Sequence, residues 1–257
     1  MQFGHVVLGP VDETAVLEGL RARAVNYDPA EAPTDDGHVA AGDSDNSNNP
    51  TSSGGHWHTE SAAVLVGQEP PGDPVPGGPW ERARTLATGY EFADPGILRA
   101  VYRADSALLG RNMLMEGRFY GLRFYFGVRV TRVFDETRGR ERVWGWGYET
   151  LSGHLEQGLI NFEVIKNLGT GQVAFRVAGY ARPARLPSPL VRAGFRVFGR
   201  WMQQRYYRAV RQRLFDLVQA GGLPVSPDRP DGLAVAPGSA RTTPWDRFAP
   251  GWLHPGP

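Results

Sequence analysis

Hydrophobic and polar residues alternate most regularly in the middle of the chain. From Leu122 to Val130 every second residue is a large apolar one, which is the two-residue period of a strand with one buried face. This alternation lies within a predicted strand over 118–134. Enrichment in β-branched and aromatic residues predicts further strands over 143–150, 159–166 and 172–180, separated by polar turns. Strands joined by short turns predict an antiparallel meander.

A longer period governs the C-terminal third of the chain. Residues 190–220 contain no proline and are followed by Gly221 and Gly222, which predicts one long helix. Its apolar residues recur three or four positions apart, as one helical face requires: Val191, Phe195, Phe198, Met202, Tyr206, Val210, Leu214 and Leu217. Such a stripe needs a surface to pack against, and the meander is the obvious partner.

Shorter elements are predicted before the meander. An amphipathic helix is predicted over 11–24, a buried strand over 61–68, and a helix from about Pro79, which suits the first helical position. A second helix is predicted from about Pro95 to Leu109, with Asp94 as its N-cap. The residues that support it recur at helical spacing: Ile97, Leu98, Val101, Ala104 and Leu108.

Glycine and proline separate these periodic segments. The 33 glycines and 21 prolines favour loops and a sheet-rich fold. A flexible polar insertion is predicted at about 30–58, because 34–55 cannot bury enough apolar surface to offset the entropy of ordering. The predicted organisation is an N-terminal extension (1–60) with this insertion, a sheet-and-helix domain (61–222) and an irregular Pro/Gly-rich tail (223–257). The fold class is α+β, an antiparallel sheet gripping a long C-terminal α-helix.

Charge and composition exclude several classes of partner. The net charge of +1 argues against nucleic acid, whose binding modules usually carry a concentrated basic excess. Of the 28 basic residues 27 are arginine, a bias typical of GC-rich coding. The row of Arg192, Arg196 and Arg200 is therefore explained by a solvated face, with a surface for phosphate or anionic lipid as the alternative. The chain contains no cysteine, so a disulfide or a thiolate metal site is not expected. Neither a signal peptide nor a membrane span is expected, and a cytoplasmic protein is predicted.

One segment resembles a known family. The run from Gly147 to Gly158, GYETLSGHLEQG, followed by Asn161, Phe162 and Glu163, resembles the signature YGT-x-x-GH-x-E-x-G of the domain-of-unknown-function family 1990 (DUF1990). Glu149 stands where the family has glycine. The resemblance extends over roughly residues 26–217 and implies a helix-grip fold of the START and birch-pollen-allergen type with a cavity, but it implies no reaction and no catalytic residues.

The same run holds the candidate chemistry. Tyr148, Thr150, His154 and Glu156 bring a phenol, a hydroxyl, an imidazole and a carboxylate within nine positions, and an imidazole beside a carboxylate can transfer protons near neutral pH. The alternative is a turn at Ser152-Gly153 whose neighbours bind backbone groups.

A second set of side chains has metal-ligand character. His56, His58 and Glu60 alternate, so on an extended segment they point to one side and offer nitrogen and oxygen ligands. A solvated strand edge explains the same pattern, and no metal or other cofactor is predicted.

The aromatic residues of the meander suggest a pocket. A helix laid across a curved sheet leaves space beside small residues such as Gly127, Gly145 and Gly147, and an aromatic-lined pocket is the usual ligand site. The predicted ligand-binding residues are Trp146, Tyr148, Thr150, Met202 and Tyr27. The predicted function is binding of a small apolar or aromatic molecule between sheet and helix. The alternative is an enzyme of the same fold in which His154 and Glu156 carry out acid/base chemistry on a polyketide-like or aromatic substrate.

Overall fold

A long antiparallel sheet dominates the computed structural model, which describes residues 5–8, 11–33, 57–119, 122–184, 205–221, 229–240 and 250–253. Neighbouring strands are antiparallel and lie in this order: β2 (His58–Gln68), β8 (Gln172–Pro183), β7 (Glu156–Asn167), β6 (Glu141–Thr150), β5 (Leu122–Arg138), β4 (Asn112–Phe119), β3 (Leu98–Arg103) and β9 (Leu233–Ala236). The strands from β3 to β8 pair in chain order, so the predicted meander is confirmed.

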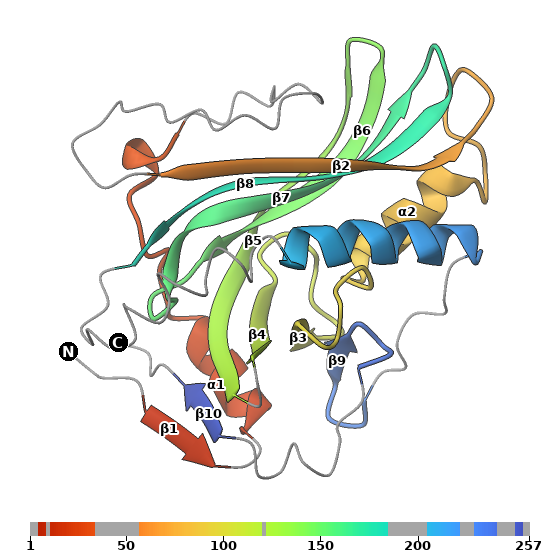
Figure 1. Ribbon diagram of the computed structural model, residues 1–257. Coiled ribbons are helices and arrows are strands. Elements are labelled where there is room, and N and C mark those ends of the chain that lie inside the picture. The colour runs from red at the N-terminus through yellow and green to blue at the C-terminus, as the bar shows by residue number, and fades with distance from the viewer. Residues whose placement is uncertain are drawn as a thin grey trace.

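Two helices cover one face of this sheet, which we call the inner face. They are α2 (Pro79–Thr88) and the C-terminal helix, helical over 205–219 (Figure 1). Trp146 and Tyr148 on β6 belong to the same buried cluster as Val210 and Leu214 of the C-terminal helix. The apolar stripe predicted for this helix therefore packs on the sheet in its described part.

The other face, the outer face, is covered at one end by α1 (Glu13–Leu20), which matches the predicted N-terminal helix. Asp12 caps it by accepting a hydrogen bond from the backbone N of Ala15 at 3.0 Å. Leu20 packs against Leu114 and Tyr125 of the sheet in a second buried cluster. The N-terminal extension thus supplies part of the core.

A second N-terminal segment packs near the other end of the outer face. Tyr27 clusters with Leu159 and Tyr180, just before the short 3-10 helix η1 (Pro29–Glu31). Trp57, which precedes β2, donates its indole N–H to the carbonyl oxygen of Glu31 at 2.7 Å. This bond joins the two ends of the chain segment that contains the predicted insertion.

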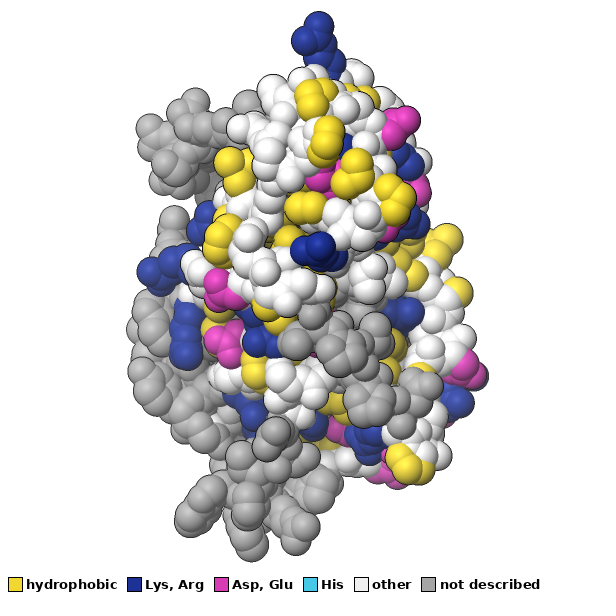
Figure 2. All heavy atoms as spheres, turned by 90° about the vertical axis from the view of Figure 1, so that its right-hand side faces the viewer, with side chains coloured by type: hydrophobic (Ala, Val, Ile, Leu, Met, Phe, Trp, Pro, Cys, Tyr) yellow, Lys and Arg dark blue, Asp and Glu magenta, His cyan; other side chains and the backbone are white. Residues whose placement is uncertain are grey.

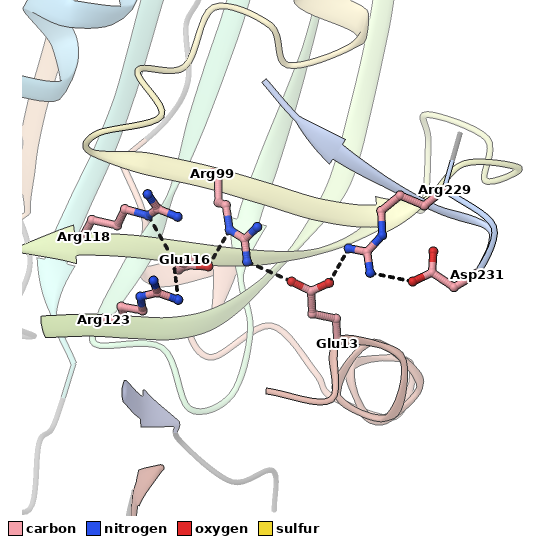
Figure 3. Close-up of polar contacts among 7 residues, drawn as sticks. All are labelled: Glu13, Arg99, Glu116, Arg118, Arg123, Arg229 and Asp231. Carbon is pink, nitrogen blue, oxygen red and sulfur yellow. Dashed lines mark hydrogen bonds and ion pairs between the residues drawn. The ribbon is translucent and has the colours of Figure 1, made fainter. Parts of the chain in front are cut away.

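A network of ion pairs connects α1 to the outer face (Figure 3). Its centre is Glu116 on β4, which is 1% exposed. Glu116 accepts hydrogen bonds from Nε of Arg99 at 2.5 Å and Nε of Arg118 at 3.0 Å, and Nη1 of Arg123 lies 3.5 Å away. Arg99 also reaches Glu13 of α1 at 2.9 Å. The network is completed by Arg229 and Asp231.

The helix predicted from Pro95 to Leu109 is wrong. Asp94 caps a turn instead, accepting hydrogen bonds from the backbone N of Gly96 and of Ile97, and β3 follows. Five of its six residues are buried, because both faces of this strand are covered. A strand buried on both faces is a continuous apolar run, which periodicity cannot distinguish from a buried helix.

The single strand predicted over 118–134 is also corrected. Its first residues end β4 and the rest lie in β5, and the two strands pair from Asn112–Arg129 to Phe119–Leu122. The interruption Tyr120-Gly121 lies outside the described residues. The segment is therefore a hairpin.

The C-terminal tail contributes two strands to the sheet. β9 pairs with β3, while β10 (Pro250–Leu253) pairs with β1 (His5–Leu8) and, in parallel, with β5. The prediction of an irregular tail is wrong for these strands, which at four residues each are too short to show a period. The predicted division into extension, domain and tail remains a prediction.

The surface mixes charges of both signs. Figure 2 shows basic and acidic side chains interspersed with hydrophobic ones over one side of the molecule, in agreement with the net charge of +1. None of the helices described here is long and apolar enough to cross a membrane. Arg192, Arg196 and Arg200 lie outside the described residues.

Candidate functional site

Strand register places the candidate residues on one face or the other. Tyr148 lies opposite Ile160, Ile160 opposite Gly179, and Gly179 opposite Glu60. Residues directly opposite one another share a face, and Tyr148 belongs to the inner-face cluster. Glu156 is four residues before Ile160 on β7, so it points to the same face. The inner face therefore carries two carboxyl groups and a phenol.

Three tyrosine hydroxyls meet beneath the C-terminal helix. Oη of Tyr90 lies 2.8 Å from Oη of Tyr206 on this helix, and Tyr148 belongs to the same buried cluster and interacts electrostatically with both. Burial raises the pKa of each of the three phenols above its ordinary value of 10. All three hydroxyls therefore keep their protons at physiological pH.

The backbone of Tyr90 is strained. Its φ of 60° lies in the left-handed region, which costs a residue other than glycine roughly 1–2 kcal/mol. The fully buried ring contacts Phe92 and Phe162 at centroid distances of 4.7 and 5.9 Å. Sequence analysis missed Tyr90, because nothing in its neighbourhood predicts this conformation, and it counted Tyr206 only as part of an apolar stripe.

His154 follows the β6–β7 turn, with its ring against Phe126 at a centroid distance of 4.5 Å. Phe126 packs on the inner-face cluster. Nδ1 of His154 accepts a hydrogen bond from the backbone N of Glu156 at 2.9 Å, so the neutral ring carries its proton on Nε2. Burial lowers the pKa of His154 to about 3. The imidazole is therefore uncharged at physiological pH.

Glu156 has the opposite shift. Burial raises the pKa of its carboxyl group to about 7, and the nearby charge of Glu60 adds to the rise. Its backbone binds His154 and Asn26, but its carboxyl group forms no hydrogen bond with any other residue that the structure describes. In place of the predicted pairing of imidazole with carboxylate, the ring of His154 contacts the backbone N–H of Glu156.

Two other predicted residues have structural partners. The hydroxyl of Thr150 donates to Oδ1 of Asn26 at 2.6 Å and accepts from the backbone N of Gly158 at 2.9 Å, which fixes the connection between β6 and β7. Trp146 is on the inner face, 1% exposed, and donates its indole N–H to the carbonyl oxygen of Ala87 in α2 at 3.1 Å. These contacts place both side chains in the framework around the site.

Tyr27 lies on the outer face and is not brought together with Tyr148. Its hydroxyl donates to Oε1 of Glu149 at 2.5 Å and lies 3.2 Å from Oη of Tyr180. Glu149, the residue that departs from the family signature, therefore has a partner in the N-terminal segment. Met202 lies outside the described residues.

The expectation that three glycines leave space for a ligand is wrong. A Cβ atom on Gly127 would lie 2.3 Å from Leu20, one on Gly145 2.6 Å from the ring of Phe134, and one on Gly147 within 2.1 Å of an amide oxygen. All three positions alternate with inner-face residues and face outward. The space beside them is filled.

The metal-ligand pattern has no counterpart in the described part of the chain, where no three acidic or histidine side chains gather closely enough to hold an ion. His58 is exposed on β2, which ends the order of strands, and His56 lies outside the described residues.

An antiparallel sheet with a C-terminal helix packed on its inner face defines an α+β protein of the helix-grip type. The chain belongs to the family described as Domain of unknown function (DUF1990), whose model matches residues 39–212, more than half of the chain. The resemblance found in the signature from Gly147 to Gly158 is thereby confirmed.

The chain is similar to several solved structures, at low identity and with TM-scores below 0.5. Ara h 8.0201 is 12% identical, with a TM-score of 0.37 over 64% of this chain and 99% of that chain. Norcoclaurine synthase from Thalictrum flavum, in complex with dopamine and hydroxybenzaldehyde, is 8% identical, with a TM-score of 0.39 over 65% and 90%. Major latex-like protein 151 from Panax ginseng is 10% identical, with a TM-score of 0.37 over 65% and 99%. No curated protein sequence matches the chain.

Proposed function

We propose that the protein binds a small, largely apolar molecule between the inner face of the sheet and the C-terminal helix. One observation carries this proposal: the carboxyl group of Glu156 faces this region without a hydrogen-bond partner in the described residues. The side chain of Glu156 is only partly exposed, and polar groups that are withdrawn from water are normally hydrogen bonded. A bound molecule supplies the missing contact.

Two apolar side chains near the candidate site are also partly exposed. Ile160 and Phe126 project from central strands of the inner face, yet both keep part of their surface exposed. In a sheet covered by a tightly packed helix, central apolar residues are expected to be closed off from solvent. This partial exposure supports room for a ligand beside Tyr148 and His154.

We expect Ile160→Trp to weaken binding of the neutral fluorescent probe N-phenyl-1-naphthylamine at least tenfold while changing stability by less than about 0.5 kcal/mol. The larger ring would fill the space that the probe uses. Leu65→Trp, on β2 at a side chain that is 54% exposed, is the matched control and should change neither property. If the inner face is solidly packed, Ile160→Trp will instead cost about 1–3 kcal/mol in urea unfolding, and the proposal fails.

The second candidate function is proton transfer on the bound molecule. The observation in its favour is the pKa of Glu156, about 7, because a general base works best when its pKa lies near the operating pH. His154, with its pKa near 3, would not accept the proton. Its Nε2–H would donate a hydrogen bond that positions the bound molecule. In this candidate enzyme, Glu156 alone is therefore the general base, in place of the predicted His154–Glu156 pair.

This candidate predicts enzyme-catalysed exchange of acidic C–H groups. In heavy water the protein should speed deuterium incorporation into the methyl group of 2-acetylnaphthalene, followed by proton NMR. Glu156→Gln should lower the catalysed rate by about 100-fold or more, and the rate should rise with pH up to about 7, as the carboxyl becomes a carboxylate. Equal rates with and without the protein would exclude this chemistry for the probe.

A further inference from the structure

The tautomer of His154 defines one side of the site. Because Nδ1 accepts the backbone N–H of Glu156 at 2.9 Å, the ring offers only its Nε2–H to other groups. That N–H has no hydrogen-bond partner among the described residues. The ring is held in place by its edge-to-face contact with Phe126. His154 is therefore a fixed donor beside the inner face.

The carboxyl group of Glu156 defines the other side. Its side chain points to the inner face, because the next residue, Gln157, points outward and binds Asn26 and Arg182 there. The ionisable groups coupled to it are Glu60 on β2, Tyr148 on β6 and Tyr207 on the C-terminal helix. The two phenols remain neutral, while burial and the charge of Glu60 both favour retention of the Glu156 proton. Up to neutral pH this carboxyl is thus a donor as well.

We propose that the polar group of the ligand is a carbonyl oxygen, which accepts hydrogen bonds from Nε2–H of His154 and from the protonated carboxyl of Glu156. This inference rests on the proposed function and names the chemical class of the ligand. A short turn and the strand that follows it place both donors beside the inner face, and two donors suit an oxygen with two lone pairs. A carboxylic acid kept neutral by its surroundings is an established way to donate to such an oxygen.

A cationic amine is the competing ligand, because Glu60 and Glu156 both carry carboxyl groups. The fixed N–H of His154 disfavours it, since an amine cation has only donors to offer and would face another donor. The amine also requires Glu156 in its charged form, which its surroundings oppose. The two ligand classes therefore predict opposite effects of pH on affinity.

Three probes of nearly equal size separate these possibilities: 2-acetylnaphthalene, 2-isopropenylnaphthalene, in which a methylene group replaces the carbonyl oxygen, and 1-(2-naphthyl)ethylamine. Each is titrated against the protein by displacement of N-phenyl-1-naphthylamine. At pH 6 the ketone should bind about tenfold more tightly than the olefin, as two net hydrogen bonds imply. At pH 8.5 this preference should fall several-fold, because the Glu156 carboxylate no longer donates and only the Nε2–H of His154 remains.

Two variants assign the donors. Glu156→Gln retains a donor and an acceptor and should make the preference for the ketone independent of pH. His154→Asn can still accept the backbone N–H two residues on but lacks a donor at the Nε2 position, and should reduce the preference for the ketone over the olefin several-fold. If either variant fails to fold, the ketone and olefin affinities of the wild-type protein at the two pH values still test the inference.

The outcomes are distinct. Equal affinity of ketone and olefin at pH 6 overturns the inference while the proposed function stands. Tightest binding by the amine, with an affinity that rises with pH, also overturns it and assigns a cationic ligand to the same site. Failure of all three probes and of the fluorescent probe to bind overturns the proposed function and this inference with it.

Discussion

Glu116→Gln is expected to reduce the free energy of unfolding by about 3–5 kcal/mol, the range measured when one member of a buried ion pair is removed. Glu116 is 1% exposed and is the carboxylate shared by Arg99, Arg118 and Arg123. Glutamine preserves the volume but removes the charge that holds three guanidinium groups together. Urea unfolding followed by tryptophan fluorescence measures the loss.

The matched control for this variant is Glu136→Gln. Glu136 also pairs with an arginine, Arg138 at 2.7 Å, but its side chain is 49% exposed. Solvent screens such a pair, so the loss should be within about 0–1 kcal/mol. Equal effects of the two substitutions would show that burial of Glu116 has no energetic consequence and would contradict the prediction.

Lys166→Met is expected to cost a similar amount, about 3–5 kcal/mol. Nζ of Lys166 is fully buried and lies 2.7 Å from Oε2 of Glu69 and 2.7 Å from the carbonyl oxygen of Asp73. Glu69 in turn accepts the backbone N–H groups of Trp80 and Val75, so the pair ties the connection before α2 to the end of β7. Methionine would leave Glu69 charged and buried.

The double variant Lys166→Met with Glu69→Gln tests this explanation. Glutamine can still accept from Trp80 and Val75 but carries no charge, so the double variant should recover part of the loss. Lys166→Arg should also be destabilising, because a guanidinium has five donors in a rigid plane, while the site supplies two acceptors to a compact ammonium group. No recovery in the double variant would mean that packing, and not charge, accounts for the loss.

The same pair predicts the acid response of the protein. Burial acts to raise the pKa of Glu69, but the hydrogen bonds from Lys166, Trp80 and Val75 prevail, so the pKa is lowered from its ordinary value of 4.5. The folded state therefore binds this proton more weakly than the unfolded state. The contribution of Glu69 to stability is complete above pH 4.5 and is lost as the pH falls through the lowered pKa. Glu69→Gln should remove that part of the pH dependence.

The sheet was predictable wherever one strand face differs from the other. The alternation from Leu122 to Val130 identified β5 because its inner and outer faces have different neighbours. It failed for β3, which is buried on both sides, and for β9 and β10, which are too short to show a period. The composition bias toward arginine gave no indication that the one lysine, Lys166, occupies a buried site that favours a compact cation.

The positions of the candidate site residues were predictable in part. Residue types alone selected Tyr148, His154 and Glu156 as candidates, and these three lie in one region of the inner face. The same reasoning placed Tyr27 in the site, because sequence does not reveal that it reaches the sheet from the outside. Tyr90 was missed, because its left-handed backbone contradicts the local preference of tyrosine and is imposed by tertiary packing. Gly127, Gly145 and Gly147 were interpreted as leaving space for a ligand, but neighbouring atoms fill that space.

The hydrogen bond between Trp57 and Glu31 bears on how the length of the chain can vary. It fixes Glu31 and Trp57 relative to each other, so residues added or removed between them change only the length of chain that joins two fixed points. The entropy of closing a flexible loop grows only with the logarithm of its length, by about 0.6 kcal/mol for each doubling. Changes of length in this connection are therefore nearly neutral, and the fold can lengthen or shorten there at little thermodynamic cost.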